Sequence, residues 1–374
     1  MRLVVVVSLV FAGVASSTGT AAVEVGKPPI HPEVQVGGFP TGIALNPVTD
    51  TIYVGNGTTG TLSVIDGKRC NAAESRGCGQ RVAVATAGVD PIGIAVDRST
   101  NTIYAANASG TVAIVDGRRC SAASRAGCRA APPTVRVGVD PQFLAVDETT
   151  HTLYVANSGS DTVSVIDGRT GRVRGSVAVG PIPFTLAVNP VTHTVYVTDL
   201  GAQTVSVVDG ASCNATKLTG CKRRPATVDV GETPGGIALD SRTNTIYVTG
   251  ETSNDVSVID GKSCNARATS GCRKRPVHVR AGDGARGIAV NELTHTVYVA
   301  NTADGTVSVI DGTACNATVR SGCGNRAAAT AVGISPRRVA VDAVTNTVYV
   351  TNAGSNSVTM IDGRTCNGRV HTRC

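Results

Sequence analysis

Short apolar runs separated by turns rich in Gly, Asn, Asp and Thr recur along the whole chain. In one stretch the runs cover residues 236–239, 245–248, 256–260 and 276–279. They are rich in β-branched residues and nearly continuous in apolarity, as is typical of strands in sheets packed on both faces. No stretch has the period of an amphipathic helix. The pattern predicts an all-β protein built from units of four strands, here called A to D in chain order.

The tyrosines show that these units repeat. All seven occupy one position, in strand B, at intervals of 51, 50, 42, 51, 51 and 51 residues: Tyr53, Tyr104, Tyr154, Tyr196, Tyr247, Tyr298 and Tyr349. A period near 50 residues with several short strands per unit is typical of propeller blades. We therefore expect a seven-bladed β-propeller with four antiparallel strands in each blade.

The two ends of the chain predict how the ring closes. Residues 33–37 read like residues 134–138, which belong to a strand D, whereas the last unit stops at Cys374 without a strand D. We expect the N-terminal strand to complete the last blade beside residues 358–361, which removes free sheet edges. The propeller should then span residues 33–374, after a signal peptide at 1–22 and a linker at 23–32.

The N-terminus has the features of an export signal. A basic Met1-Arg2 precedes an apolar run from residue 3 to 14, and Ala15 and Ala22 are small residues suited to cleavage. The run is much shorter than the roughly 18 residues of a membrane span. No cysteine precedes Cys70 to carry a lipid anchor. We expect a secreted, monomeric protein without a membrane span.

Cysteines occur in pairs with seven residues between them, always between strands C and D. The third unit lacks the pair and has only a short connection at residues 168–172. Loss of both cysteines together indicates local partners, and two thiolates per blade do not make a four-cysteine zinc site. We therefore favour disulfides, each worth about 2–3 kcal/mol, over zinc. The pairs are Cys70/Cys78, Cys120/Cys128, Cys213/Cys221, Cys264/Cys272, Cys315/Cys323 and Cys366/Cys374.

Two further positions repeat in the turns. The A–B turn ends in Asp, Asn or His, and strand C ends in Asp-Gly in every unit. Asp and Asn tolerate positive φ, and Asp can accept a hydrogen bond from its own turn. We predict turn roles for these residues, including His151, His193 and His295, rather than catalysis, and we expect the glycine to adopt left-handed geometry.

Positive charge is concentrated in one kind of loop. The net charge is +7, and 25 of the 34 Lys and Arg residues lie in the C–D segments. One face of the propeller should therefore be basic, suited to an anionic polymer or simply to solvation. Nucleic acid is a poor candidate because aromatic residues for base stacking are scarce.

The D–A turns, on the opposite face, are where the repeats differ most. The residues after the recurring proline include Gln142, Phe143 and Phe184 in the third and fourth units, and Arg337 and Arg338 in the seventh. Arg286 holds the same position in the sixth unit. We predict an aromatic sector facing an arginine sector across the channel mouth, with these six residues binding a ligand. The alternative is that the side chains plug the channel or face solvent.

The amino-acid sequences of the predicted strands resemble those of a known family. Residues 52–56 (Ile-Tyr-Val-Gly-Asn), residues 349–352 (Tyr-Val-Thr-Asn) and the repeated Val-Ser-Val-Ile-Asp-Gly resemble the YVTN-type β-propeller repeats of exported bacterial and archaeal proteins. The resemblance covers essentially the whole chain after the leader. It implies the seven-bladed scaffold and no particular catalytic set.

Two classes of function remain. The first is an exported, non-catalytic binding or scaffold protein that engages a surface polymer, an anionic ligand or a partner protein. The alternative is a lyase or lactonase with a metal-assisted site at the channel mouth. Such an enzyme needs convergent histidines and carboxylates, whereas the strand A text, as at residues 93–96 and 287–290, is apolar. We favour binding, with no catalytic residue, metal ligand or cofactor.

Overall fold

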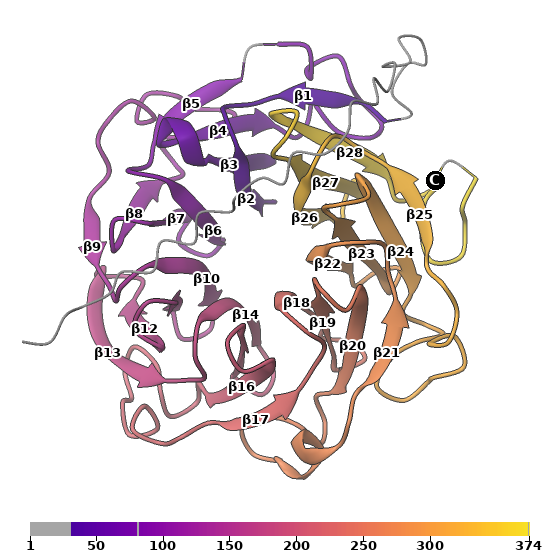
Figure 1. The fold of residues 1–374 in the computed structure, drawn as a ribbon. Helices are drawn as coiled ribbons and strands as arrows, with labels where there is room; N and C mark the ends of the chain where they lie inside the picture. Colours follow the sequence, from indigo (N-terminus) through magenta and orange to yellow (C-terminus); the bar gives the residue numbers. More distant parts are fainter. Residues whose placement is uncertain (1–30, 81, 373) are drawn as a thin grey trace, which may run out of the picture.

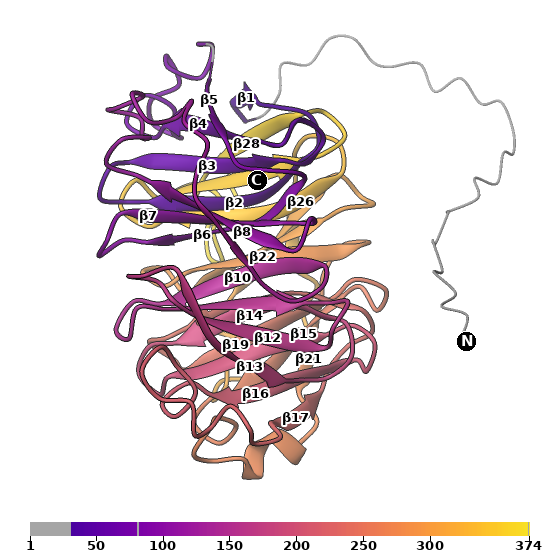
Figure 2. The same ribbon diagram turned by 90° about the vertical axis from the view of Figure 1, so that its left-hand side faces the viewer.

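Seven four-stranded antiparallel sheets form a closed ring (Figure 1). This is a computed structural model, which describes residues 31–80, 82–372 and 374. Strand A of each blade lies nearest the centre and strand D lies at the outside, and the ring viewed edge-on is a thick disc (Figure 2). The predicted seven-bladed propeller is confirmed. The predicted signal peptide and most of the predicted linker lie outside the described residues.

The strands of the seven blades have the following bounds. Blade 1 contains β2 (Pro40–Asn46), β3 (Thr51–Asn56), β4 (Thr61–Asp66) and β5 (Ala83–Thr86), and blade 2 contains β6 (Pro91–Asp97), β7 (Thr102–Asn107), β8 (Thr111–Asp116) and β9 (Thr134–Arg136). Blade 3 contains β10 (Pro141–Asp147), β11 (Thr152–Asn157), β12 (Thr162–Asp167) and β13 (Arg172–Ala178), and blade 4 contains β14 (Pro183–Asn189), β15 (Thr194–Asp199), β16 (Thr204–Asp209) and β17 (Ala226–Asp229). Blade 5 contains β18 (Pro234–Asp240), β19 (Thr245–Gly250), β20 (Asp255–Asp260) and β21 (Val277–Arg280), and blade 6 contains β22 (Ala285–Asn291), β23 (Thr296–Asn301), β24 (Thr306–Asp311) and β25 (Ala328–Ala331). Blade 7 contains β26 (Pro336–Asp342), β27 (Thr347–Asn352), β28 (Ser357–Asp362) and β1 (Glu33–Gln35).

Ring closure follows the prediction. The N-terminal strand β1 pairs antiparallel with β28, with Val34 opposite Val358. The backbone N–H of Met360 donates to the carbonyl of Pro32 at 2.9 Å, which extends the pairing by one residue. Among the described residues the only helical segments are two short 3-10 turns, η1 (Gly57–Thr59) and η2 (Ser270–Arg273). None of them could cross a membrane.

The turn predictions hold, with one correction. The last residue of the A–B turn has φ between 46° and 56° in all seven blades, as at Asp50 and Asn101. The strand C aspartates accept the backbone N–H two residues further on, as in Asp260 to Lys262. The following glycine, however, is not left-handed. At Gly312 a Cβ would lie 2.4 Å from the His295 carbonyl oxygen, so close backbone approach is what requires glycine there.

The same A–B turns also join neighbouring blades, which the sequence analysis missed. His151, His193 and His295 contact the strand A aspartates of the preceding blades, Asp97, Asp147 and Asp240, at 3.2, 2.8 and 2.6 Å. Where strand A ends in Asn, the partner is Asn, as in Asn189 and Asn244. Aspartate is thus matched with histidine and asparagine with asparagine at six of the seven interfaces, so these side chains complement each other in pairs.

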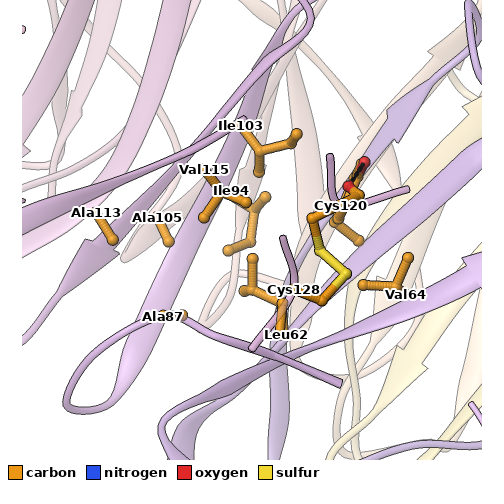
Figure 3. Packing of buried hydrophobic residues seen from close by; sticks show 12 residues of the cluster. Leu62, Val64, Ala87, Ile94, Ile103, Ala105, Ala113, Val115, Cys120 and Cys128 are labelled. Carbon is orange, nitrogen blue, oxygen red and sulfur yellow. Dashed lines mark hydrogen bonds between the residues drawn. A yellow bond between two sulfur atoms is a disulfide. The ribbon is translucent and has the colours of Figure 1, made fainter. Parts of the chain in front are cut away.

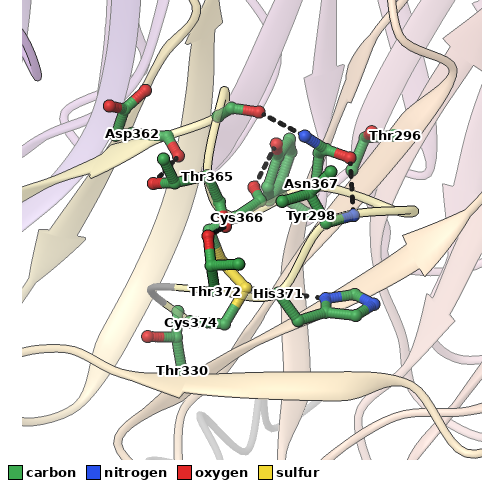
Figure 4. Close-up of a disulfide and its surroundings, with 12 residues drawn as sticks. Thr296, Tyr298, Thr330, Asp362, Thr365, Cys366, Asn367, His371, Thr372 and Cys374 are labelled. Atoms are coloured by element: carbon green, nitrogen blue, oxygen red, sulfur yellow. Dashed lines mark hydrogen bonds between the residues drawn. A yellow bond between two sulfur atoms is a disulfide. The ribbon is translucent and has the colours of Figure 1, made fainter.

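Each tyrosine hydroxyl links its blade to the next one. It donates a hydrogen bond to a carbonyl in the C–D turn of the following blade at 2.7–3.1 Å. Tyr298, for example, donates to Cys366 at 2.8 Å (Figure 4). All seven tyrosines are fully buried. Blade 7 donates to Cys70 of blade 1, so this series of bonds closes around the ring.

The predicted disulfides are confirmed. All six are present. Five lie within one C–D loop each, and the sixth, Cys366–Cys374, lies in the equivalent segment after β28. The described residues contain no free cysteine, so the zinc alternative is dropped. The bonds are Cys70–Cys78, Cys120–Cys128, Cys213–Cys221, Cys264–Cys272, Cys315–Cys323 and Cys366–Cys374.

Each disulfide packs against the apolar core of the preceding blade. The Cys120–Cys128 bridge of blade 2 lies beside Leu62 and Val64 of blade 1 (Figure 3). The loops therefore act as caps that join one blade to the previous one.

The segment after strand C of the following blade, which carries the disulfide, also forms a hydrogen bond with the first residue of strand B. In six blades a loop N–H donates to this threonine, as from Ala317 to Thr245 at 3.0 Å. Thr102 receives no such bond within the described residues, because blade 3 lacks the loop.

We predict that Thr245→Val lowers the free energy of unfolding by about 1–2 kcal/mol because it leaves the Ala317 N–H without an acceptor. Thr102→Val should change it by less than about 0.5 kcal/mol, and equal losses in urea titrations would contradict this account.

Blade 4 contains a buried carboxyl group where five other blades have an amide. Strand B ends in Asn in five blades, and the Asn157 amide donates to the hydroxyl of Ser164 at 3.0 Å. Asp199 accepts from Ser206 and Thr204 instead, while its Oδ1 is buried without a partner. Burial raises the pKa of Asp199 to about 6, an effect that these hydrogen bonds only partly offset.

Replacing the buried carboxyl group of Asp199 should therefore stabilise the protein. A carboxyl whose pKa is raised on folding contributes stability at low pH that is lost as the pH rises from about 4 through 6. Asp199→Asn should raise the free energy of unfolding by about 1–3 kcal/mol at pH 7.5, with the gain shrinking towards pH 4. Urea titrations at both pH values measure this, and an unchanged or less stable variant at pH 7.5 would show that the carboxylate is well accommodated.

Candidate functional site at the channel mouth

The D–A turns place their residues at the mouth in a constrained backbone conformation. The residue before strand A has positive φ in every blade: Phe39, Asp90, Asp140, Ile182, Thr233, Gly284 and Ser335. Ile182 and Thr233 are β-branched, and such residues rarely adopt this conformation. Strain of this kind persists only where the surrounding structure holds it, and it is concentrated at functional sites. The mouth is therefore a fixed surface.

One cavity of about 180 Å³ lies at this mouth. All six predicted binding residues line it: Gln142, Phe143, Phe184, Arg286, Arg337 and Arg338. They come from the strand A segments of blades 3, 4, 6 and 7, which converge at the centre of the ring. Phe39, Thr41, Asp90 and Ile92 complete the lining. The structure thus brings the predicted residues together, and their role in binding stays a prediction.

The cysteines do not belong to this site. None of the twelve lines the mouth cavity. Cys78, Cys272 and Cys323 are instead buried in hydrophobic clusters with side chains of the preceding blade. The disulfide residues predicted from the sequence are therefore structural, and they contribute to the site only through the rigidity of the ring.

The aromatic and arginine sectors differ from the prediction in one respect. They do not face each other across an open mouth but touch. The guanidinium carbon of Arg338 lies 4.0 Å from the ring centre of Phe143 and 5.2 Å from that of Phe184. The two rings meet edge to face at 5.3 Å. Cation–π contacts explain why the cationic and aromatic groups pack together here, and the cavity is the space that they leave.

Two of the three arginines are held by the protein itself. Arg286 donates through Nη1 to both carboxylate oxygens of Glu251, at 2.8 and 3.1 Å. Arg338 donates through Nη1 to the carbonyl of Gly235 at 3.1 Å, so it connects blade 7 to blade 5. Glu251 therefore neutralises Arg286 and leaves the charge of the other two arginines uncompensated.

Arg337 has the least complete environment. Its guanidinium lies 4.9 Å from the ring centre of Phe39, and its Nε is buried without a hydrogen-bond partner. Within the described part of the chain no carboxylate lies within 4 Å of Arg337 or Arg338. Burial, and next the nearby charge of Arg286, lowers the pKa of both groups. A donor without an acceptor in a region of positive charge is suited to an anionic acceptor.

The remaining acidic residues of this face do not line the cavity. Asp199 is buried inside blade 4, and Asp255 pairs with His278 at 2.8 Å. The described residues contain no group of three or more His, Cys, Asp or Glu side chains that could hold a metal ion. Asp90 and the ion pair of Glu251 were not predicted from the sequence, because only the folded ring shows which turn residues point inward.

Comparisons with known proteins place the chain among propellers. No curated protein matches its sequence. Hydrazine synthase from Kuenenia stuttgartiensis is similar in structure, with a TM-score of 0.67 and 18% identity over 87% of this chain and 95% of that one. Virginiamycin B lyase from Staphylococcus aureus has a TM-score of 0.64 and 8% identity over 88% of this chain and 97% of that one. At these identities the likeness shows the fold alone.

A sequence profile gives the family. The profile described as "Lactonase, 7-bladed beta-propeller" matches residues 138–373, which is more than half of the chain. The matched region begins in the turn before β10 of blade 3 and continues beyond β28 of blade 7, and it contains all six predicted binding residues. The chain therefore belongs to the lactonase family of seven-bladed β-propellers.

Proposed function

We propose that the channel mouth binds a small ligand with a carboxylate or phosphate group. The observation that carries this proposal is the buried Nε of Arg337, which has no acceptor, beside a second arginine without a carboxylate partner. Guanidinium groups form paired, charge-assisted hydrogen bonds to carboxylate and phosphate. Phe143 and Phe184, which line the same cavity, supply an apolar surface for the rest of the ligand.

The charges around the mouth favour a small ligand over a polymer. Exposed carboxylates lie in the turns of the same face: Asp140, Asp161, Glu232, Asp283 and Asp304. An extended polyanion on this face would meet these like charges, whereas a small anion would contact only the central arginines. The expectation of an anionic polymer as partner therefore suits the basic C–D face better than the mouth.

A second candidate, lactone hydrolysis, is favoured by family membership. In that reaction water attacks the lactone carbonyl, the ring oxygen leaves, and a hydroxy acid forms. Arg337 and Arg338 would stabilise the oxyanion, and Asp90, which lines the cavity, would accept the proton from water. The cavity does not fit a divalent metal ion, because its lining has three guanidinium groups and a single carboxylate, Asp90. We therefore derive no step through a metal.

Two further properties belong to this proposal. Six disulfides suit an oxidising compartment, so we infer an exported protein. Membership of the YVTN-type repeat group likewise stays a prediction, drawn from the Tyr-Val-Thr-Asn text of strand B.

The arginine proposal can be tested with one pair of matched variants. The probes are inorganic phosphate, gluconate and glucono-δ-lactone, measured by calorimetry with the full-length mature protein. Arg337→Gln should weaken binding of the anion that binds best by about 10- to 100-fold, which corresponds to the loss of a charged hydrogen bond. Arg275→Gln, at an exposed position in the opposite C–D loop, should leave the affinity unchanged.

The same variants separate the two candidate functions. If glucono-δ-lactone is hydrolysed faster than in buffer, and Arg337→Gln slows this reaction without unfolding the protein, lactone hydrolysis is supported. Equal weakening by Arg275→Gln would move the site to the basic face, and we would then abandon the mouth as the binding site.

A further inference from the structure

Six of the seven blades are covered by the disulfide loop of the blade that follows, and one blade is not. Each loop contributes a peptide N–H to the strand B threonine and a disulfide to the apolar core beneath it. Blade 2 should receive its loop from blade 3. There the connection is a tight turn, in which the Gly168 carbonyl still accepts from Tyr104 at 2.9 Å but no disulfide follows.

The missing loop leaves blade 2 open to solvent. Thr102 is partly exposed, whereas the equivalent threonines of the other six blades are 0% exposed. Ile114 of strand C is also partly exposed, whereas its six counterparts are buried, as Val258 is. Asp116 is exposed and its six counterparts are less so. Three positions from two strands therefore mark the same uncovered patch.

A cavity of about 510 Å³ occupies this place. Ile114, Val115, Pro132 and Pro133 form apolar walls, and Thr102 also lines the cavity. Arg118, Arg119 and Arg169 belong to the lining too, with Asp116 as its one carboxylate. The cavity lies on the C–D face, on the opposite side of the ring from the channel mouth, and shares no residue with the mouth cavity.

We infer that this uncovered place on blade 2 is a docking site for a short acidic peptide segment of a partner protein. The protein itself shows what fits, because the six equivalent places are all filled by a peptide loop that donates an N–H to threonine and covers the strand C side chain. An acidic segment is required because three arginines face one aspartate. A small molecule would match the volume but has no counterpart elsewhere in the ring.

The probe is a synthetic, disulfide-closed peptide copied from the loop of blade 4, residues 210–224. One version keeps the native sequence, and a second replaces Lys217, Lys222, Arg223 and Arg224 by Glu. Fluorescence anisotropy with the full-length mature protein should show at least tenfold tighter binding of the acidic version. Arg118→Glu/Arg169→Glu, at two exposed positions, should reverse this preference.

A second variant fills the site covalently. Replacing residues 168–171 by residues 210–225 gives blade 3 the loop that it lacks, and this variant should lose binding of the acidic peptide. Three results overturn the inference: no binding of the acidic peptide up to about 1 mM, equal binding to the loop-filled variant, or a dimer of the unaltered protein that dissociates when the site is filled. The last result would assign the place to a second copy of the chain.

Discussion

The hydrogen bond from each buried tyrosine to the C–D turn of the next blade is the interaction on which this ring depends. A phenol hydroxyl inside an apolar core needs an acceptor, and a turn carbonyl facing that core needs a donor. The hydroxyl and the carbonyl satisfy each other across each of the seven blade interfaces, and the seventh hydrogen bond joins the last blade to the first. The tyrosine therefore fixes the distance and rotation between neighbouring blades, and the disulfide loop is held above it.

A ring fixed in this way leaves one region free to vary. Strands B and C are nearly uniform from unit to unit, and strand B holds the tyrosine and the threonine that form hydrogen bonds with the C–D segment of the next blade. The residues that begin strand A differ most between units, and several of them line the channel mouth. The third blade is a second departure, because it omits the loop without losing the tyrosine bond. Both candidate sites therefore lie where the repeat is broken: at the arginines of the mouth, and at the uncovered place on blade 2.

Much of this architecture could be predicted from the sequence because it repeats. The spacing of the tyrosines predicts seven blades, the strand-like text at residues 33–37 predicts closure through β1, and the paired cysteines predict six local disulfides. The residues of the mouth stand out because they differ between units. The contacts among these residues could not be predicted from the sequence. Arg338 reaches Phe143 and Gly235 across the channel, and no local pattern encodes a distance between blades so far apart in sequence.

Other features escaped prediction for a related reason. The Asp and His residues that pair between blades each have a role in their own A–B turn, which is enough to account for them in the sequence. Because the partner lies in another repeat unit, the pairing itself leaves no local signal. The positive φ of Ile182 and Thr233 contradicts local preference, and the carbonyls of both residues accept N–H groups from the B–C turn of the same blade. The exposure of Thr102 likewise depends on a loop missing from the neighbouring blade.

The most direct test of the tyrosine account is a spectrophotometric alkaline titration at the wavelength of tyrosinate, followed in parallel by circular dichroism. All seven tyrosines of the chain occupy the same position, and there is no tryptophan to interfere. Burial, above all, raises the pKa of these tyrosines above their ordinary value. A group with a raised pKa contributes stability that is lost as pH rises above the unfolded value of about 10. We predict that all seven ionise together, above that pH and in one step that coincides with unfolding. Ionisation near pH 10 in a ring that remains folded would contradict the account.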